Sequence, residues 1–167
     1  MNNRLTWGLF AAWAVHDAEE WLTIGRWSAR RAAMQRQGRR GPRLPQISDA
    51  RMRTGIAVLA PIVAATALHG ARTGGRSRLF QAAVAGFGLH GFGHLAASAA
   101  MRGYTPGVAT APIVVIPFGA WAWHRLGREG IRRPAVATAR DGIVAVAAAL
   151  VLGHGGAAAI RYGNRHF

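Results

Sequence analysis

The chain has 167 residues, the length of one ordinary domain, and 51% of them are hydrophobic. It contains no Cys, which excludes disulfides and thiolate metal sites, so a metal would need His, carboxylate or backbone oxygen ligands. All 21 basic residues are Arg, and with six acidic residues the formal net charge is +15.

The arginines are sorted by segment. Five apolar runs contain none of them, namely residues 5–24, 54–71, 79–101, 103–124 and 141–160. Each run approximates the roughly 20 residues that cross a hydrocarbon layer, whereas a soluble helix would carry Arg along its polar face. The sequence predicts an all-α, polytopic bundle of about five transmembrane helices, forming one domain over 1–167 in the cell membrane. Despite the basic pI, nucleic acid is not an expected partner.

The first run, 5–24, also resembles a secretory signal, because Ala12 and Ala14 stand at A-x-A spacing after Arg4. The apolar pattern continues past the acidic residues to Ile24, which favours a retained span.

The next segment, 25–53, is a basic loop with nine Arg, whose first part continues the first helix. It is expected to attract anionic lipid headgroups, at about 1 kcal/mol per Arg near the surface. Counting Arg places this loop inside and the N-terminus outside. The alternative is a re-entrant fourth run, with 25–53 and 125–140 on the same side.

The fourth run, 103–124, has a helix-start pattern. Thr105 is expected to cap the helix and Pro106 to take its first position. Pro112 and Pro117 predict kinks.

Half of the acidic residues lie in the HDAEE stretch of the first run. His16, Glu19 and Glu20 share one helical arc, and Asp17 points about 100° away. An ionisable residue within a span costs roughly 2.5–3.5 kcal/mol, so such residues normally line a site or pair.

The third run carries His90 and His94, again four residues apart. Small residues share their face and predict a close contact with another helix, at Ala83, Gly86, Gly93 and Ala97.

The first, third and fifth runs are parallel if two crossings separate them. At about 1.5 Å per residue from the middle of each run, six polar residues fall at one depth. They are His16, Glu19, Glu20, His90, His94 and His154.

Histidine and carboxylate ligands suit Zn, Fe or Mn. The expected metal ligands are His16, Glu20, His90, His94 and His154, with Glu19 and Glu20 as catalytic residues and no organic cofactor. A metal-free His–Glu hydrogen-bond network and plain packing are the alternatives. His69 and His124 are expected at the interface.

Three stretches, HDAEE at 16–20, HGFGH at 90–94 and YTPG followed by Thr110, resemble the bacterial HXXEE-motif membrane proteins. The resemblance covers residues 7 to about 120. That family's middle motif often reads N-x-x-x-H, so here His90 takes the Asn place, and the resemblance implies a ligand role for His94 more than for His90. The function of the family is not established.

The expected function is a metal-dependent membrane enzyme, a hydrolase or oxidoreductase, acting on a lipid-like or isoprenoid substrate. One alternative is a transporter or channel for protons or metal ions that uses the same residues. Another is a small scaffold that binds a partner through its Gly-rich faces. A homo-oligomer is also open.

Overall fold

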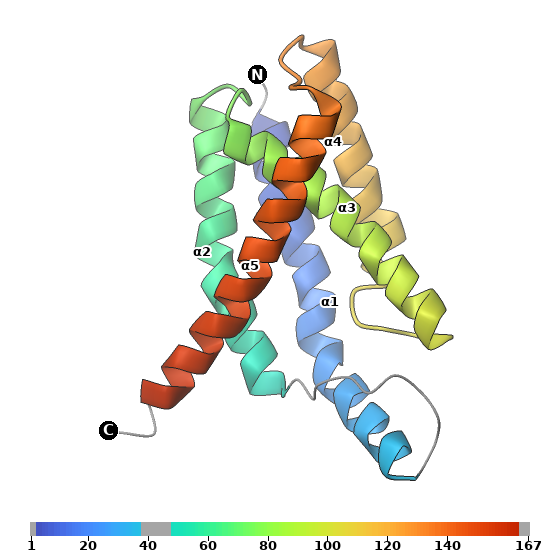
Figure 1. The fold of residues 1–167 in the computed structure, drawn as a ribbon. Helices are drawn as coiled ribbons and strands as arrows, with labels where there is room; N and C mark the ends of the chain where they lie inside the picture. The colour runs from blue at the N-terminus through green and yellow to red at the C-terminus, as the bar shows by residue number, and fades with distance from the viewer. Residues whose placement is uncertain (1–2, 38–47, 164–167) are drawn as a thin grey trace.

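The computed structural model describes residues 3–37 and 48–163, and every regular element in these ranges is helical (Figure 1). The side chains of Asp49, His154 and residues 156–163 lie outside the description. The elements are α1 (Asn3–Arg36), α2 (Asp49–Arg72), α3 (Arg78–Met101), the π-helical turn η1 (Ala111–Val115), α4 (Ile116–Arg128) and α5 (Ala135–Gly163). The all-α prediction is therefore confirmed for the described residues.

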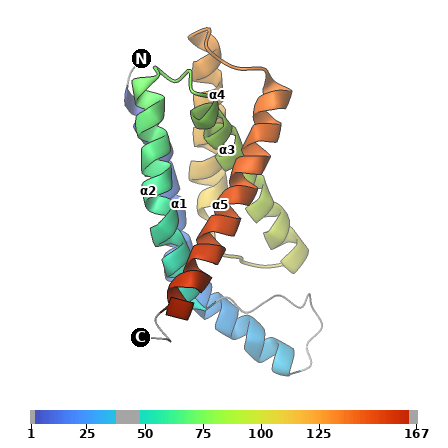
Figure 2. The ribbon, with the colours of Figure 1, turned by 60° about the vertical axis from the view of Figure 1, so that its left-hand side comes forward.

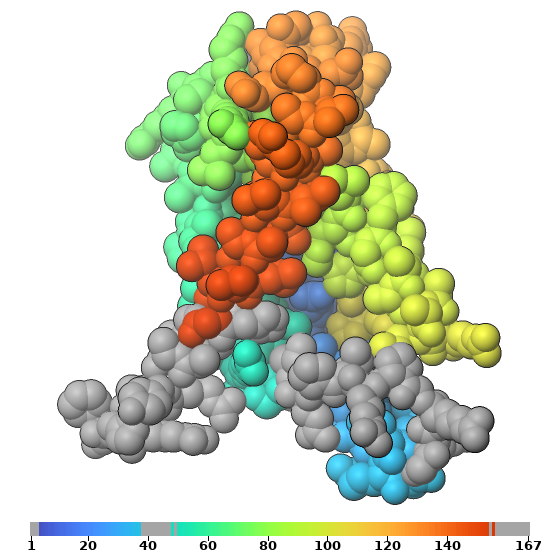
Figure 3. Space-filling view, in the orientation of Figure 1, coloured from blue at the N-terminus to red at the C-terminus, as the bar shows by residue number. Residues whose placement is uncertain are grey.

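Successive helices run in alternating directions (Figures 1 and 2). The α2–α3 and α4–α5 turns lie at the end of the bundle where the chain begins, and the α3–α4 connection lies toward the other end. α3 packs against α2, α4 and α5, and α1 packs against α2 and against η1, α4 and α3. The space-filling view shows α5 over the front of the molecule, between α2 and α3 (Figure 3).

Only two stretches of the described chain are long and apolar enough to cross a bilayer, Ala50–Arg72 in α2 and Ala135–Gly153 in α5. This finding rests only on the length and the amino-acid composition of the two stretches. α4, with 13 residues, is too short by itself. α1 is long enough, but Asp17, Glu19 and Glu20 interrupt its apolar run.

The apolar core joins the first turns of α1 and α3 to the end of α4. Its most buried large side chains are Leu9, Phe80, Val84, Val115 and Leu126. Burying each contributes roughly 1.5–3 kcal/mol relative to full exposure. This core fixes α1 against α3 and so determines which of their residues meet further along the two helices.

Small residues allow α3 and α5 to cross closely. A Cβ on Gly86 would lie 2.5 Å from the carbonyl oxygen of Gly142, and one on Gly142 would lie 2.6 Å from the Gly86 nitrogen. The close contact predicted for this face of α3 is therefore present at Gly86. It is absent at Gly93, which is exposed and would place a Cβ with nothing within 4 Å.

The helix start predicted at Thr105 and Pro106 is wrong, since η1 begins at Ala111. Gly107 has φ +84°, which is not helical, and the buried hydroxyl of Thr105 has no hydrogen-bond partner among the residues that the structure describes. At the two prolines that predict kinks, the chain forms η1, which contains Pro112 and ends two residues before Pro117; the N–H of Ile116 donates five residues back to Ala111.

Candidate metal centre

Four side chains meet at the centre of the molecule. They are His16 and Glu20 of α1 and His90 and His94 of α3, and each offers a ligand atom within 4.8 Å of the others. Nε2 of His94 lies 3.1 Å from Nε2 of His16, 2.8 Å from Nε2 of His90 and 3.6 Å from Oε1 of Glu20. We call these four residues the His–Glu cluster.

Helical periodicity explains the cluster. Each helix contributes two residues spaced four apart, and such residues lie one above the other on the same face. α1 and α3 therefore need to approach along only one line for all four side chains to meet. His16 is 1% exposed, and an edge of its ring faces Phe87 with the ring centroids 6.0 Å apart. The cluster is thus shielded from solvent on the His16 side.

The tautomer of His94 follows from its second nitrogen. Nδ1 lies 2.9 Å from the carbonyl oxygen of Pro106, and a carbonyl can only accept. Nδ1 therefore carries the proton, and in the neutral ring Nε2 presents a lone pair to the cluster.

The tautomer of His16 follows in the same way. Nδ1 of His16 lies 2.7 Å from Oγ1 of Thr110, and that hydroxyl lies 2.7 Å from Oε2 of Glu19. The hydroxyl donates to the carboxylate, so its oxygen accepts from Nδ1–H of His16. Nε2 of His16 is then also a lone-pair donor.

Two neutral imidazoles thus face each other through lone pairs 3.1 Å apart. Lone pairs repel unless a cation lies between them. Two nitrogens that each lie 2.0–2.1 Å from a tetrahedral Zn²⁺ are about 3.3 Å apart. The spacing of His16 and His94 therefore fits two ligands of one metal ion, whereas Nε2 of His90, at 2.8 Å from Nε2 of His94, is closer than two tetrahedral ligands lie.

The two glutamates have different contacts. Glu20 faces the histidines, whereas Glu19 faces the loop that follows α3. The carboxylate of Glu19 accepts hydrogen bonds from the hydroxyl of Tyr104 at 2.6 Å, from the N–H of Ala109 at 3.1 Å and from the N–H of Thr110 at 2.8 Å. These donors and the Thr110 hydroxyl bind both carboxylate oxygens of Glu19. Its hydrogen bonds therefore position the loop after α3.

Residues 104–110 form a cover over the cluster. A Cβ on Gly107 would lie 2.6 Å from Nδ1 of His94 and 2.8 Å from Cε1 of His16, so only glycine fits here. The cover is tied to α1 at a second point, because Nε1 of Trp27 donates to the carbonyl of Tyr104 at 2.8 Å.

The remaining predicted residues lie elsewhere. The side chain of His154 is outside the described residues, although the neighbouring Gly153 packs against Gly55 of α2. His69 and His124 are exposed and do not belong to the cluster. The contacts of Pro106 and Gly107 have no signal in the periodicity of the helices. Thr110 is visible only through the family resemblance.

These contacts define an all-helical protein with a largely enclosed cluster of three histidines and one glutamate, of which His16 is fully buried, covered by a loop. The chain belongs to the family of proteins of unknown function with an HXXEE motif, whose model matches residues 7–122. The motif is His16, Glu19 and Glu20, and the match includes the whole His–Glu cluster and its cover. No curated protein and no solved structure matches the chain.

Proposed function

We propose that the protein is a metal-dependent membrane enzyme that acts on a lipid-like or isoprenoid substrate. The observation that carries the proposal is the pair of imidazole lone pairs, on His16 and His94, that converge in a half-buried cluster. A polar arrangement that served packing alone would not orient two bases toward the same point.

The residues of the cluster have different proposed roles. His16, His90 and His94 supply nitrogen ligands that suit Zn, Fe or Mn. Such an ion would act as a Lewis acid toward a carbonyl or phosphoryl oxygen. Glu20 lies slightly farther from His94 than the other ligands do, so it serves either as the fourth ligand or as the group that takes a proton. The second role favours hydrolysis.

In this proposal all five helices cross the membrane. α2 and α5 are apolar enough to cross on their own composition. α1 and α3 direct His16, Glu20, His90 and His94 toward each other, which offsets the cost of carrying these ionisable side chains in a span. The alternating directions of the helices fit five crossings.

A pocket of about 510 Å³ next to the cover supports the proposed substrate class. Tyr104 lines this pocket and also binds Glu19, the residue next to Glu20 in the chain, although none of the four cluster residues lines the pocket itself. Four arginines and several apolar side chains share its wall: Arg26, Arg30, Arg31, Arg102, Leu22, Trp27, Met34 and Met101. Such a lining suits an anionic head on an apolar body, in line with attraction of anionic lipid headgroups.

Metal analysis tests the proposal. Purified wild-type protein is expected to retain about one equivalent of metal, and His16→Ala and His94→Ala are expected to lose it. His69→Ala is the matched control, because His69 is exposed and outside the cluster. Wild-type protein that holds no metal after exposure to Zn²⁺, Fe²⁺ and Mn²⁺ would overturn the proposal.

A second candidate is transport of protons or metal ions. Nε2 of His94 lies within hydrogen-bond distance of both other imidazoles, so the three rings form a continuous path. Flux in proteoliposomes separates the two functions. Flux in wild type that is lost in Glu20→Gln would favour transport.

A further inference from the structure

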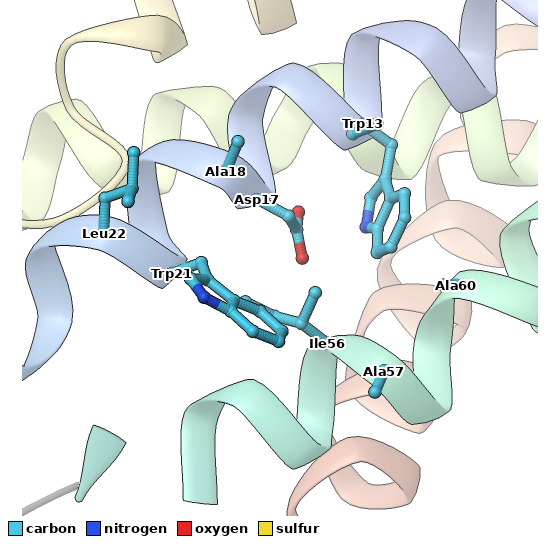
Figure 4. Close-up of a pocket in the computed structure, with 9 residues that line it drawn as sticks. Trp13, Asp17, Ala18, Trp21, Leu22, Ile56, Ala57 and Ala60 are labelled. Carbon is cyan, nitrogen blue, oxygen red and sulfur yellow. The ribbon is translucent and has the colours of Figure 1, made fainter. Parts of the chain in front are cut away.

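A pocket of about 470 Å³ lies between α1 and α2, where α1 turns a different face from the one that carries the His–Glu cluster (Figure 4). α1 contributes Trp13, Ala14, Asp17, Ala18, Trp21 and Leu22, and α2 contributes Ile56, Ala57 and Ala60. The volume lies within the roughly 300–1,000 Å³ of small-molecule sites. None of the nine lining residues belongs to the cluster.

Asp17 is the one ionisable residue in this wall. It is 8% exposed, and its carboxyl group has no hydrogen bond or ion pair with any residue in 3–37 or 48–163. In Figure 4 the two oxygens point into the pocket, in the gap between the rings of Trp13 and Trp21. A buried carboxyl group without a partner is costly, and within a span it points to a functional site.

The chemistry of the wall restricts the ligand. Apart from Asp17, aliphatic and indole side chains line the pocket. Mg²⁺ and Ca²⁺ need six or more oxygen ligands, which this wall does not supply. Indole faces attract organic cations, and the guanidinium of Arg53 already lies 5.4 Å from the ring centroid of Trp21.

We propose that this pocket binds a lipophilic organic monocation. Its ammonium group lies against the carboxylate of Asp17, and its apolar body lies between the two indoles and α2. The ligand supplies the counter-charge that the described chain does not. The site does not depend on the proposed enzyme function, because none of the proposed metal ligands lines this pocket.

The test is a titration of purified protein in lipid nanodiscs with phenylpropyltrimethylammonium, followed by tryptophan fluorescence and calorimetry. The uncharged isostere, in which carbon replaces nitrogen, is titrated in parallel. The cation is expected to bind at least 10-fold more tightly than the isostere. Equal affinity for the two would overturn the proposal, because the pocket would then be an apolar cleft only.

Two variants locate the site. Asp17→Asn keeps the shape of the side chain and is expected to weaken cation binding roughly 10- to 100-fold. Trp21→Leu is expected to weaken it roughly 3- to 30-fold. Trp7→Leu, on α1 but outside the pocket, is the control and keeps wild-type affinity. Unchanged affinity in Asp17→Asn would overturn the proposal.

Metal content is measured on the same samples. Asp17→Asn is expected to retain the metal of the wild type, which shows that the bundle has folded. Loss of cation binding with metal retained supports the pocket. An absence of metal from every sample, with cation binding that depends on Asp17, would reject the enzyme proposal and leave this one standing.

Discussion

The hydroxyl oxygen of Thr110 lies 2.7 Å from Nδ1 of His16. The same hydroxyl donates to Glu19, whose other hydrogen bonds come from the loop after α3. A carboxylate, a hydroxyl and an imidazole thus form one chain of hydrogen bonds that ends at a candidate metal ligand. Outer partners of this kind fix the tautomer and orientation of ligating histidines.

Thr110→Val removes this link at nearly constant volume. Metal affinity is expected to fall roughly 10- to 100-fold, because Nδ1 of His16 then has no acceptor and the ring is free to change tautomer. Competition with a chelator of known affinity measures the change. Thr110→Ser keeps the hydroxyl and should bind nearly as tightly as wild type. Equal affinity in all three proteins would contradict the role given to Thr110.

Gly107→Ala is expected to damage the cluster directly. The new Cβ would overlap the rings of His94 and His16, and φ +84° adds backbone strain of roughly 1 kcal/mol or more. We expect a lower melting temperature and loss of metal.

Gly130→Ala is the control for the backbone term. Gly130 has φ +66°, but a Cβ there would meet nothing within 4 Å. The Gly130→Ala variant should therefore have a lower melting temperature and the metal content of the wild type. Metal loss in both variants would show that strain alone, and not contact with the histidines, causes the effect.

Gly142→Ala tests the crossing of α3 and α5. Its Cβ would meet backbone atoms of Gly86 and Ala82 at 2.6 and 2.9 Å, so the helices must separate. A loss of about 1–3 kcal/mol in the free energy of unfolding is expected. Gly93→Ala lies on α3 where no described atom is near the new Cβ, so it should leave the free energy of unfolding unchanged or raise it by roughly 0.5–1 kcal/mol. Denaturant titration compares the two, and equal effects would contradict the close crossing.

The chain has no native Cys, so single cysteines report the sidedness of the loops. Gly103→Cys lies between α3 and η1, and Gly130→Cys lies between α4 and α5. If η1 and α4 together cross the bilayer, a membrane-impermeant thiol reagent should label these positions from opposite sides. Labelling of both from the same side would support a re-entrant fourth segment.

The sequence was sufficient to predict five helical segments, from the lengths of the apolar runs, and the ligand pairs, from helical periodicity. Residues four apart share a face whatever surrounds them, so His16 and Glu20, and likewise His90 and His94, could be paired in advance. Comparing depths along parallel runs placed six residues together, and the four of these two pairs do meet. Glu19, also placed there, binds the cover instead, and the side chain of His154 lies outside the described residues.

The cover could not be predicted in this way. Its conformation depends on Glu19, which lies some ninety residues earlier and binds the N–H groups of Ala109 and Thr110. Local capping rules therefore placed the helix start at Thr105. Glu19 and Glu20 are adjacent in sequence, but Glu19 binds the cover and Glu20 faces the histidines. This difference depends on the tertiary contact and could not be predicted from the sequence.

α1 has 34 residues and is therefore about 51 Å long, whereas a typical hydrocarbon layer is about 30 Å thick. In the proposed membrane setting the apolar run 5–24 matches that thickness at about 30 Å, and the last turns of α1, which carry Arg26, Arg30, Arg31 and Arg36, extend beyond the layer. In a layer of different thickness such a helix adjusts by tilting. His16 and Glu20 are carried on that same rod. The acyl-chain length of the host lipid would thus set how deep the reactive centre lies, and with it which bonds of a neighbouring lipid come within its reach.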